Sequence, residues 1–151
     1  MSGLIIENGI LIACTSRDTN ITVPDGVHTI GENAFKGCVS LEEVFLPDFV
    51  THIMQQAFKG CRKLRSINFP DSLIHIGDYA FHRCPSLLNI QLPPSVTTLG
   101  NWVFLFCDNL ISASIPGFVN MGNQAFYHNL KLQTITLSAD LNPECIGDTF
   151  I

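Results

Sequence analysis

Charged residues are scarce in this sequence. Only 14% of its 151 residues are Asp, Glu, Lys or Arg, whereas 46% are hydrophobic. Disordered chains show the opposite balance, so this composition excludes a disordered protein. The net charge is −5, and residues of one sign form no long run. The chain lacks the basic stripe that is typical of nucleic-acid-binding proteins, so we expect no nucleic-acid partner.

Long apolar runs are missing as well. No window approaches the roughly 20 apolar residues that a membrane-spanning helix needs, so we expect no membrane insertion. The first residues carry no basic segment, and Glu7 and Asn8 interrupt the apolar run, which argues against a signal peptide. We expect a cytoplasmic location. An extracellular or cell-surface location is the alternative, if a signal peptide has been removed.

The six cysteines do not follow the spacings of zinc sites, since neither a CxxC pair nor a matching Cys/His combination occurs. Catalysis would need a nucleophile, a base and an orienting group that converge on one point. No residue departs from the repeat pattern described below to supply such a group. We therefore expect no metal, no cofactor and no catalytic residue, and a protein that is not an enzyme.

The chain does contain a regular internal repeat. Proline recurs every 23 residues, at positions 24, 47, 70, 93 and 116. A repeat of this length is typical of a solenoid, in which each coil buries its apolar face only when its neighbours stack on it. We expect one domain over residues 1–151, with five repeats of about 23 residues between residues 21 and 137.

The hydrophobic residues of these repeats fall into columns. Each coil ends with apolar residues two positions apart, such as Ile67 and Phe69, and this alternation predicts a half-buried strand. Stacked coils would join these strands into a continuous parallel sheet. The principal columns are Val27, Val50, Leu73, Val96 and Val119; Ile30, Ile53, Ile76 and Leu99; Phe35, Phe58, Phe81, Phe104 and Phe126; and Leu41, Leu64, Leu87 and Leu110.

A cysteine column and a glycine column run beside them. The cysteine column is Cys38, Cys61, Cys84 and Cys107, with Asn129 in the fifth coil. Both residue types can hydrogen-bond buried backbone in a turn, so we expect buried free thiols, which favour a reducing compartment; disulfides are the alternative. The glycine column indicates a tight bend or a backbone with positive φ, and we expect a local deviation where Met54 interrupts it. Its glycines are Gly31, Gly77, Gly100 and Gly122.

The repeat, Leu-x-x-Ile-x-Leu-Pro followed by Val-x-x-Ile-Gly-x-x-Ala-Phe-x-x-Cys, closely resembles the BspA-like leucine-rich repeat family, the 23-residue Treponema-type class. The resemblance covers residues 21–137. It implies a right-handed leucine-rich repeat solenoid, with one parallel β-strand per coil and short helical or irregular turns opposite. It also implies a protein-binding or adhesion module, because family members are mostly known or inferred as such, and it carries no catalytic motif.

The two ends differ from the repeats. Asn8-Gly9 is a strong hairpin turn signal between apolar stretches, so we expect residues 1–20 to form an N-terminal β-hairpin cap. Residues 138–151 match the repeat only in part. We expect an atypical terminal coil or cap there, or the point at which a longer array was cut.

Function in a repeat protein is expected in the variable columns. Two columns of mostly small polar residues face outward from the predicted sheet. A solvated face and a binding surface explain them equally well. The candidate protein-binding residues on this face are Glu43, Phe45, Asn68, Asn89 and Gln91.

A second candidate surface is aromatic. Tyr79 and Trp102 occupy the same position in successive coils, and the chain predicts an exposed patch on coils three to five. Such patches mark interaction sites, unless the C-terminal segment or a turn covers them. The candidate binding residues in this patch are Tyr79, Trp102, Leu105, Phe106 and Tyr127. In coils one to three, six of the eight Lys and Arg residues form a basic rim, either solvated or a site for an acidic partner.

We therefore expect a non-catalytic protein–protein interaction module, and the sequence does not identify the protein partner. The first alternative is a fragment of a secreted or surface adhesin. The second is a self-associating structural repeat protein, with the aromatic patch as the interface of a homo-oligomer.

Overall fold

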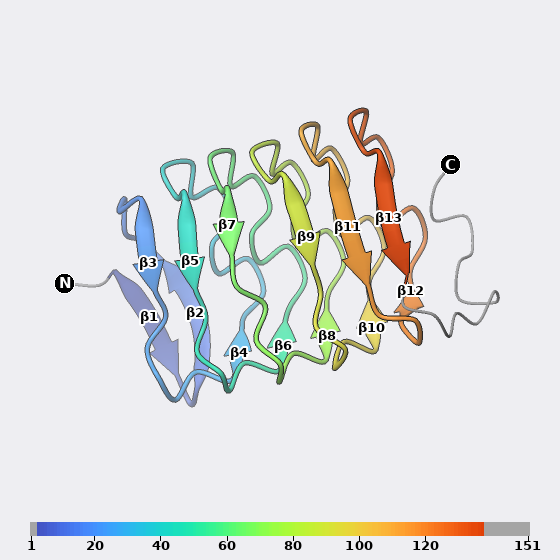
Figure 1. Cartoon of the computed structure of the whole chain (residues 1–151). Helices are drawn as coiled ribbons and strands as arrows, with labels where there is room; N and C mark the ends of the chain where they lie inside the picture. Colours follow the sequence, from blue (N-terminus) through green and yellow to red (C-terminus); the bar gives the residue numbers. More distant parts are fainter. Residues whose placement is uncertain (1–2, 138–151) are drawn as a thin grey trace.

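The computed structural model describes residues 3–137, which form a solenoid of stacked coils (Figure 1). The described residues contain no helix, and so none that could span a membrane. The predicted terminal coil at 138–151 lies outside them. The strands are β1 (Leu4–Glu7), β2 (Ile10–Cys14), β3 (Asn20–Thr22), β4 (Thr29–Ile30), β5 (Glu43–Phe45), β6 (His52–Ile53), β7 (Ser66–Ile67), β8 (His75–Ile76), β9 (Asn89–Gln91), β10 (Thr98–Leu99), β11 (Ser112–Ile115), β12 (Asn120–Met121) and β13 (Thr134–Leu137).

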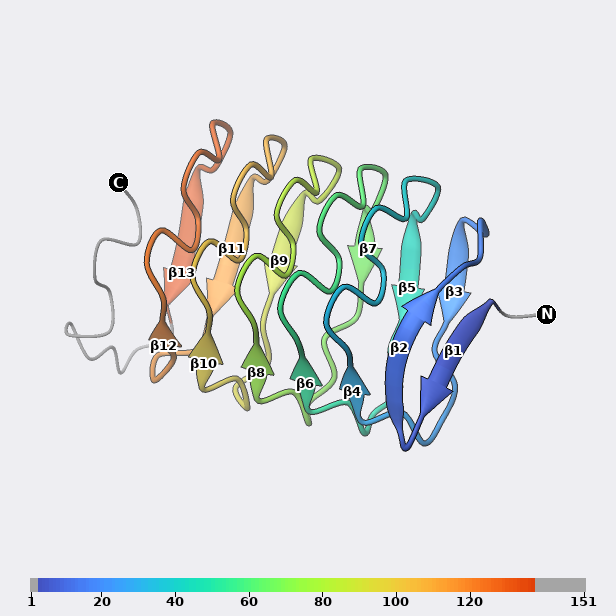
Figure 2. The same cartoon turned by 180° about the vertical axis from the view of Figure 1, so that it is seen from behind.

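The leucine-rich repeat solenoid is confirmed, and each complete coil contributes two strands. The predicted strands form two parallel sheets, β3-β5-β7 and β9-β11-β13. A seven-stranded sheet, β1-β2-β4-β6-β8-β10-β12, lines the other side, as Figure 2 shows from behind. Its repeat strands have only two residues each, too few for an alternating pattern to reveal them.

The predicted N-terminal hairpin is present and forms the first layer of the stack. Strands β1 and β2 pair antiparallel around Asn8 and Gly9, both of which have positive φ. Strand β2 then pairs parallel with β4, with Leu11 opposite Ile30. Because both of these side chains are fully buried, the hairpin closes the N-terminal end of the core.

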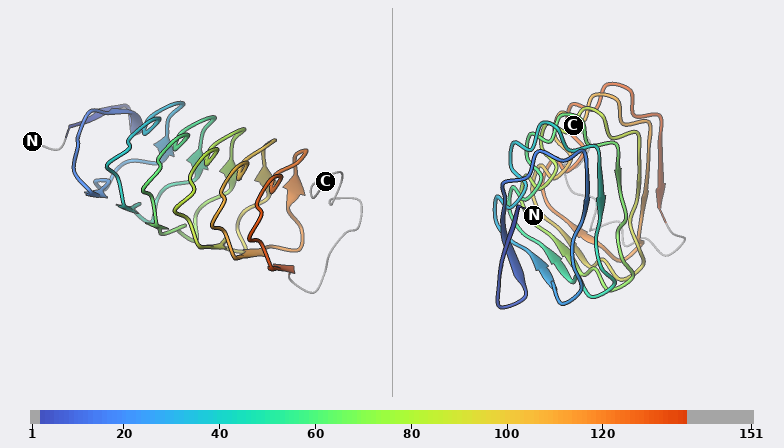
Figure 3. Two further views of the ribbon diagram at one scale, coloured as in Figure 1. Left: turned by 90° about the horizontal axis from the view of Figure 1, so that it is seen from above. Right: turned by 90° about the vertical axis from the view of Figure 1, so that its left-hand side faces the viewer.

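A ladder of phenylalanine rings forms the centre of the core. Successive coils follow nearly the same path, as the view along the stack shows (Figure 3). The rings of neighbouring coils therefore stack at the spacing of the strands, with centroids 4.8, 5.1, 5.4 and 5.1 Å apart. We number the coils by this ladder, one to five: Phe35, Phe58, Phe81, Phe104 and Phe126.

The cysteine column satisfies buried carbonyl groups. The thiol of Cys84 donates a hydrogen bond to the carbonyl oxygen of Phe58 at 3.1 Å, and Cys61 and Cys107 make the equivalent bond. In the fifth coil, the side-chain amide of Asn129 donates to the carbonyl oxygen of Phe104 at 2.9 Å. The structural interpretation of this column, including the exchange of Cys for Asn, is confirmed.

The glycine column has another cause than the one predicted from the sequence. None of its four residues has positive φ. Instead, a Cβ atom on Gly77 would lie 2.6 Å from the backbone nitrogen of Gln55, so glycine permits close approach of the previous coil. The expected deviation at Met54 is also not seen in the hydrogen bonding, since Met54 N donates to Ile30 O as Gly77 N donates to Ile53 O.

The predicted continuous sheet is interrupted between β7 and β9, which do not pair. At this point Phe69 takes the place that smaller aliphatic residues hold in other coils, and its ring packs edge-on against Phe81 at 5.8 Å. Next to it, the side chain of Asn68 bonds both the backbone nitrogen and the carbonyl oxygen of Leu46. These bonds extend the pairing of the β5 and β7 coils beyond the last paired residues, on the side away from the break.

Candidate protein-interaction surface

Aromatic side chains gather on the turns that follow the short strands of coils three to five. The indole of Trp102 stacks on the ring of Tyr79, with 5.1 Å between centroids and 15° between planes. Further along the stack, the ring of Phe106 lies 4.5 Å from the ring of His128. We call this group the turn-side cluster; its members are Tyr79, His82, Trp102, Phe106, Tyr127 and His128.

Four of the six cluster members, Tyr79, Trp102, Phe106 and His128, have left-handed backbone. The φ angle is 55° at Tyr79, 53° at Trp102 and 57° at Phe106. In coils one and two, Gly37 and Gly60 hold the position of Phe106. Glycine adopts positive φ without strain, whereas a bulky side chain there costs on the order of 1–3 kcal/mol. The left-handed backbone therefore makes these aromatic side chains less favourable and does not explain their presence.

The aromatic residues of the predicted patch lie together, but they are less exposed than the sequence suggested. Trp102 and Phe106 are half-buried and Tyr127 is 39% exposed, but Leu105 is only 9% exposed and belongs to the core. Leu105 shares its column with lysines in coils one and two, whose long side chains reach solvent from the same backbone position. The shorter apolar chain turns inward instead, because burial is favourable for it.

His82 is the buried polar member of the cluster. It lies between the rings of Tyr79 and Phe106, at 5.5 and 5.9 Å, and neither of its ring nitrogens has a hydrogen-bond partner within residues 3–137. Burial, followed by the charges of Lys59 and Arg83, lowers the pKa of His82 to about 4. The imidazole is therefore neutral at pH 7.

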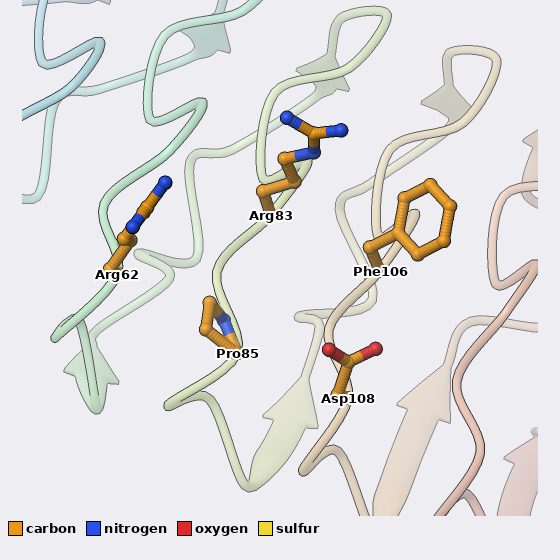
Figure 4. A pocket seen from close by; sticks show the side chains of 5 residues that line it. All are labelled: Arg62, Arg83, Pro85, Phe106 and Asp108. Atoms are coloured by element: carbon orange, nitrogen blue, oxygen red, sulfur yellow. The ribbon is translucent and has the colours of Figure 1, made fainter.

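A hollow of about 330 Å³ adjoins the cluster, and its lining is visible in Figure 4. Its residues are Arg62, Arg83, Pro85, Phe106 and Asp108. The guanidinium of Arg83 lies 6.0 Å from the centre of the Phe106 ring, a cation–π contact. The sequence indicated the basic rim but not its contact with Phe106. The common column of Gly37, Gly60, Arg83 and Phe106 was the signal that could have connected them.

The sheet face places its candidate residues on both sides of the break. Glu43 and Phe45 lie on β5, and Phe45 is 49% exposed. Asn89 and Gln91 lie on β9, and with Asn68 they line a groove of about 500 Å³ between the two sheets. Asn68 is already engaged with backbone, so it offers less to a ligand than the other four.

Large apolar side chains are also exposed at positions that the sequence did not indicate as binding sites. Phe118 is 72% exposed and lines a separate hollow of about 310 Å³ with Pro94 and Ile115. The residue two positions after each repeat proline is Gly, Phe or Ser, and this variation was the available signal. The only exposed aromatic residue at the equivalent position is Phe49, three coils away, so the two do not form one patch.

The structure brings two histidines together without making a metal cluster. The rings of His52 and His75 lie 5.8 Å apart on β6 and β8. The Nδ1 atom of each is within hydrogen-bond distance of a threonine hydroxyl. Within the described part of the chain, no group of three or more His, Cys, Asp or Glu residues is placed to hold a metal ion.

Comparison with known proteins places this architecture in a family. A family model described as the BspA type leucine rich repeat region matches residues 5–133 in six copies. A leucine-rich repeat protein of T. pallidum is 37% identical, with a TM-score of 0.81, over 83% of this chain and 62% of that one. A leucine-rich cell surface protein of Faecalibacterium prausnitzii is 28% identical, with a TM-score of 0.83, over 93% and 38%.

A leucine-rich repeat protein of Bacteroides ovatus is 31% identical, with a TM-score of 0.66, over 79% of this chain and 37% of that one. This chain thus spans less than two thirds of the length of these relatives. No curated protein is similar enough to count as a match. The family match covers most of the chain, and the stacked coils agree with it. The chain therefore belongs to the BspA-type leucine-rich repeat family.

Proposed function

We propose that this chain is a non-catalytic protein-interaction module that binds its partner through the turn-side cluster. One observation carries the proposal: Trp102 and Phe106 are half-exposed and held on left-handed backbone, where the same positions in coils one and two have smaller or more permissive residues. A strained backbone position is retained where the side chain has a use. Large, rigid aromatic side chains are the usual anchors of protein interfaces.

The non-catalytic role is supported by the family and by the pattern of the repeat. The solved relatives are described as leucine-rich repeat proteins, and none of the three descriptions mentions a reaction. The cysteines of the buried column are poor nucleophiles, because burial raises the pKa of the Cys84 thiol well above its usual range and leaves little thiolate. A structural role in the core accounts for these thiols.

We further propose a cell-surface or extracellular location in place of the cytoplasmic one. The F. prausnitzii relative is described as a cell surface protein, which supports this proposal. The free thiols do not require a reducing compartment, because Cys61, Cys84 and Cys107 are fully buried and out of reach of oxidants. The adhesin alternative thereby gains support over a purely intracellular adaptor.

The test compares binding of two double variants with that of the unaltered protein. Trp102→Ala/Phe106→Ala removes the turn-side anchors, and Phe45→Ala/Gln91→Ala removes side chains from the sheet face. Each protein is immobilised and exposed to extracellular-matrix and cell-surface protein fractions. Circular dichroism and urea unfolding check that all three are folded. Loss of a captured protein with the first variant alone supports the proposal.

Two other outcomes would contradict it. Loss of binding with the sheet-face variant alone would move recognition to the sheet face. Self-association of the unaltered protein that disappears in the Trp102→Ala/Phe106→Ala variant, measured by analytical ultracentrifugation, would make the cluster a homo-oligomer interface instead.

A further inference from the structure

Four cations on the turn side form no ion pair with a carboxylate of residues 3–137. Arg62, Arg83, Lys36 and Lys59 line adjoining hollows, and among residues 3–137 the one ion pair joins Arg65 to Glu42 instead. The whole chain carries a net charge of −5. An acidic protein that leaves its basic residues together and unpaired presents a local positive surface, which attracts anionic groups from solution.

These cations line two adjoining hollows, which we together call the turn-side groove. A hollow of about 280 Å³ over coils one to three shares Arg62 and Arg83 with the hollow that contains Phe106. Its floor includes Gly37 and Gly60, and a Cβ atom added to Gly37 would meet nothing within 4 Å. The missing side chains leave the backbone of these coils open to a ligand. In coil four the same column carries the Phe106 ring, which ends the open stretch.

We propose that this groove binds an extended acidic peptide segment of a partner protein, with a neutral apolar or aromatic residue seated against Phe106. The inference rests on the proposed function and names the chemistry of its partner. Coils are spaced about 4.8 Å apart, so three intervals from coil one to coil four span about 14 Å. An extended chain advances about 3.3 Å per residue, so the groove takes a segment of four to five residues.

The charges set the order of residues in that segment. The guanidinium groups of Arg62 and Arg83 can each donate two charge-assisted hydrogen bonds to one carboxylate. Lys36 and Lys59 supply further positive charge toward coil one. In the same coil as Phe106, the carboxylate of Asp108 lines the hollow and repels another acidic residue (Figure 4). Acidic residues therefore lie over coils one to three, and the neutral residue lies at coil four.

Direct binding of synthetic peptides tests this proposal. The probe is a fluorescein-labelled peptide of four glutamates followed by phenylalanine, and its partner has four glutamines in place of the glutamates. Fluorescence polarisation is measured at low salt and at 150 mM salt. We expect the glutamate peptide to bind at least about tenfold more tightly than the glutamine peptide, with weaker binding at the higher salt.

Charge variants and a control outside the groove test whether the peptide binds at Arg62 and Arg83. We expect Arg62→Gln/Arg83→Gln to weaken binding at least about tenfold, and Asp108→Asn to strengthen it severalfold. The control, Arg65→Gln, removes one positive charge from an ion pair outside the groove and should change binding less than about twofold. Glutamine already occupies left-handed backbone at Gln56 and Gln124, so Arg83→Gln is expected to fold.

Three results would overturn the inference: equal binding of both peptides, equal loss with Arg65→Gln and the groove variant, or equally tight binding of an oligothymidylate of the same charge. The last would indicate a general polyanion surface. The proposed function fails differently. A partner that is lost with Trp102→Ala/Phe106→Ala but is indifferent to Arg62→Gln/Arg83→Gln would leave the interaction module in place and refute only the acidic segment.

Discussion

Tyr79 and Trp102 stack face to face across two coils, with their ring centroids 5.1 Å apart, and both residues have left-handed backbone. An aromatic pair contributes about 0.5–1.5 kcal/mol beyond area burial, whereas two bulky residues at positive φ cost about 1–3 kcal/mol each. The stacking contribution alone therefore does not offset the strain. Partial burial of both rings and the hydrogen bond from Trp102 Nε1 to Gln124 Oε1, at 2.9 Å, add to the stability of the pair.

The phenylalanine ladder predicts a large effect of one core substitution. Phe81 is fully buried and stacks between Phe58 and Phe104. Phe81→Ala is expected to lower the free energy of unfolding by about 3–5 kcal/mol, because it opens a cavity between coils. Urea unfolding measures this loss, with Phe106→Ala as the control on the half-exposed side. A loss below about 1 kcal/mol for Phe81→Ala would contradict the assigned core.

His82 predicts a pH dependence of stability. Its pKa is about 4 in the folded protein and near 6.5 when unfolded, so the unfolded chain takes up the proton first as the pH falls. Stability should therefore fall between about pH 6.5 and 4, by on the order of 3 kcal/mol. His82→Leu introduces the residue that coil four has at this position, Leu105, and should remove the part of the pH dependence that comes from His82. Identical slopes in urea unfolding at pH 7, 5.5 and 4.5 for both proteins would contradict the assignment.

Asn129 allows a test of the cysteine column. Its side chain donates to the carbonyl oxygens of Phe104 and Phe126 and accepts from the backbone nitrogen of Cys107. Asn129→Ala leaves these groups without their partner and should cost about 1–3 kcal/mol. Asn129→Cys should recover part of that loss, because a thiol makes the equivalent bond in three earlier coils. Equal thermal unfolding of the two variants would argue against the equivalence of Cys and Asn.

The thiols of Cys14 and Cys38 form the pair that an oxidising compartment would link. Both are half-buried and line one groove, whereas three other thiols are fully buried. Burial, followed by the nearby Cys14 thiol, raises the pKa of Cys38 to about 12, so its oxidation should be slow. In a Cys145→Ser background, oxidised glutathione should slowly convert them to one disulfide and release two reduced glutathiones. Mass spectrometry should show a loss of about 2 Da, one hydrogen atom from each thiol.

The control for that experiment is Cys14→Ser in the same background. It should end as unmodified protein or as a glutathione adduct of Cys38, without an internal disulfide. A disulfide that includes Cys61, Cys84 or Cys107 in the folded protein would contradict their burial. The wild-type bridge would attach the hairpin to coil one and fit the proposed extracellular location.

The repeat made much of the fold predictable from the sequence. A period of 23 residues and recurring Phe, Cys and Leu positions identify the inward columns, because a side chain at the same place in every coil can be satisfied only by its copies above and below. Asn8-Gly9 identified the hairpin through turn chemistry alone. The stack of Tyr79 on Trp102 followed from their shared column, since stacked strands fix the spacing.

Tertiary structure alone decided the features that depend on contacts between coils. The two-residue strands of the seven-stranded sheet exist only through their neighbours, and the break beside Phe69 depends on how one ring fits against Phe81. Burial of Leu105 and His82, and the groove that joins Arg83 to Phe106, likewise arise from the direction of each side chain in a turn. A column predicts which residues are neighbours, but local φ and the space left by the adjacent coil decide whether a side chain faces the core or the solvent.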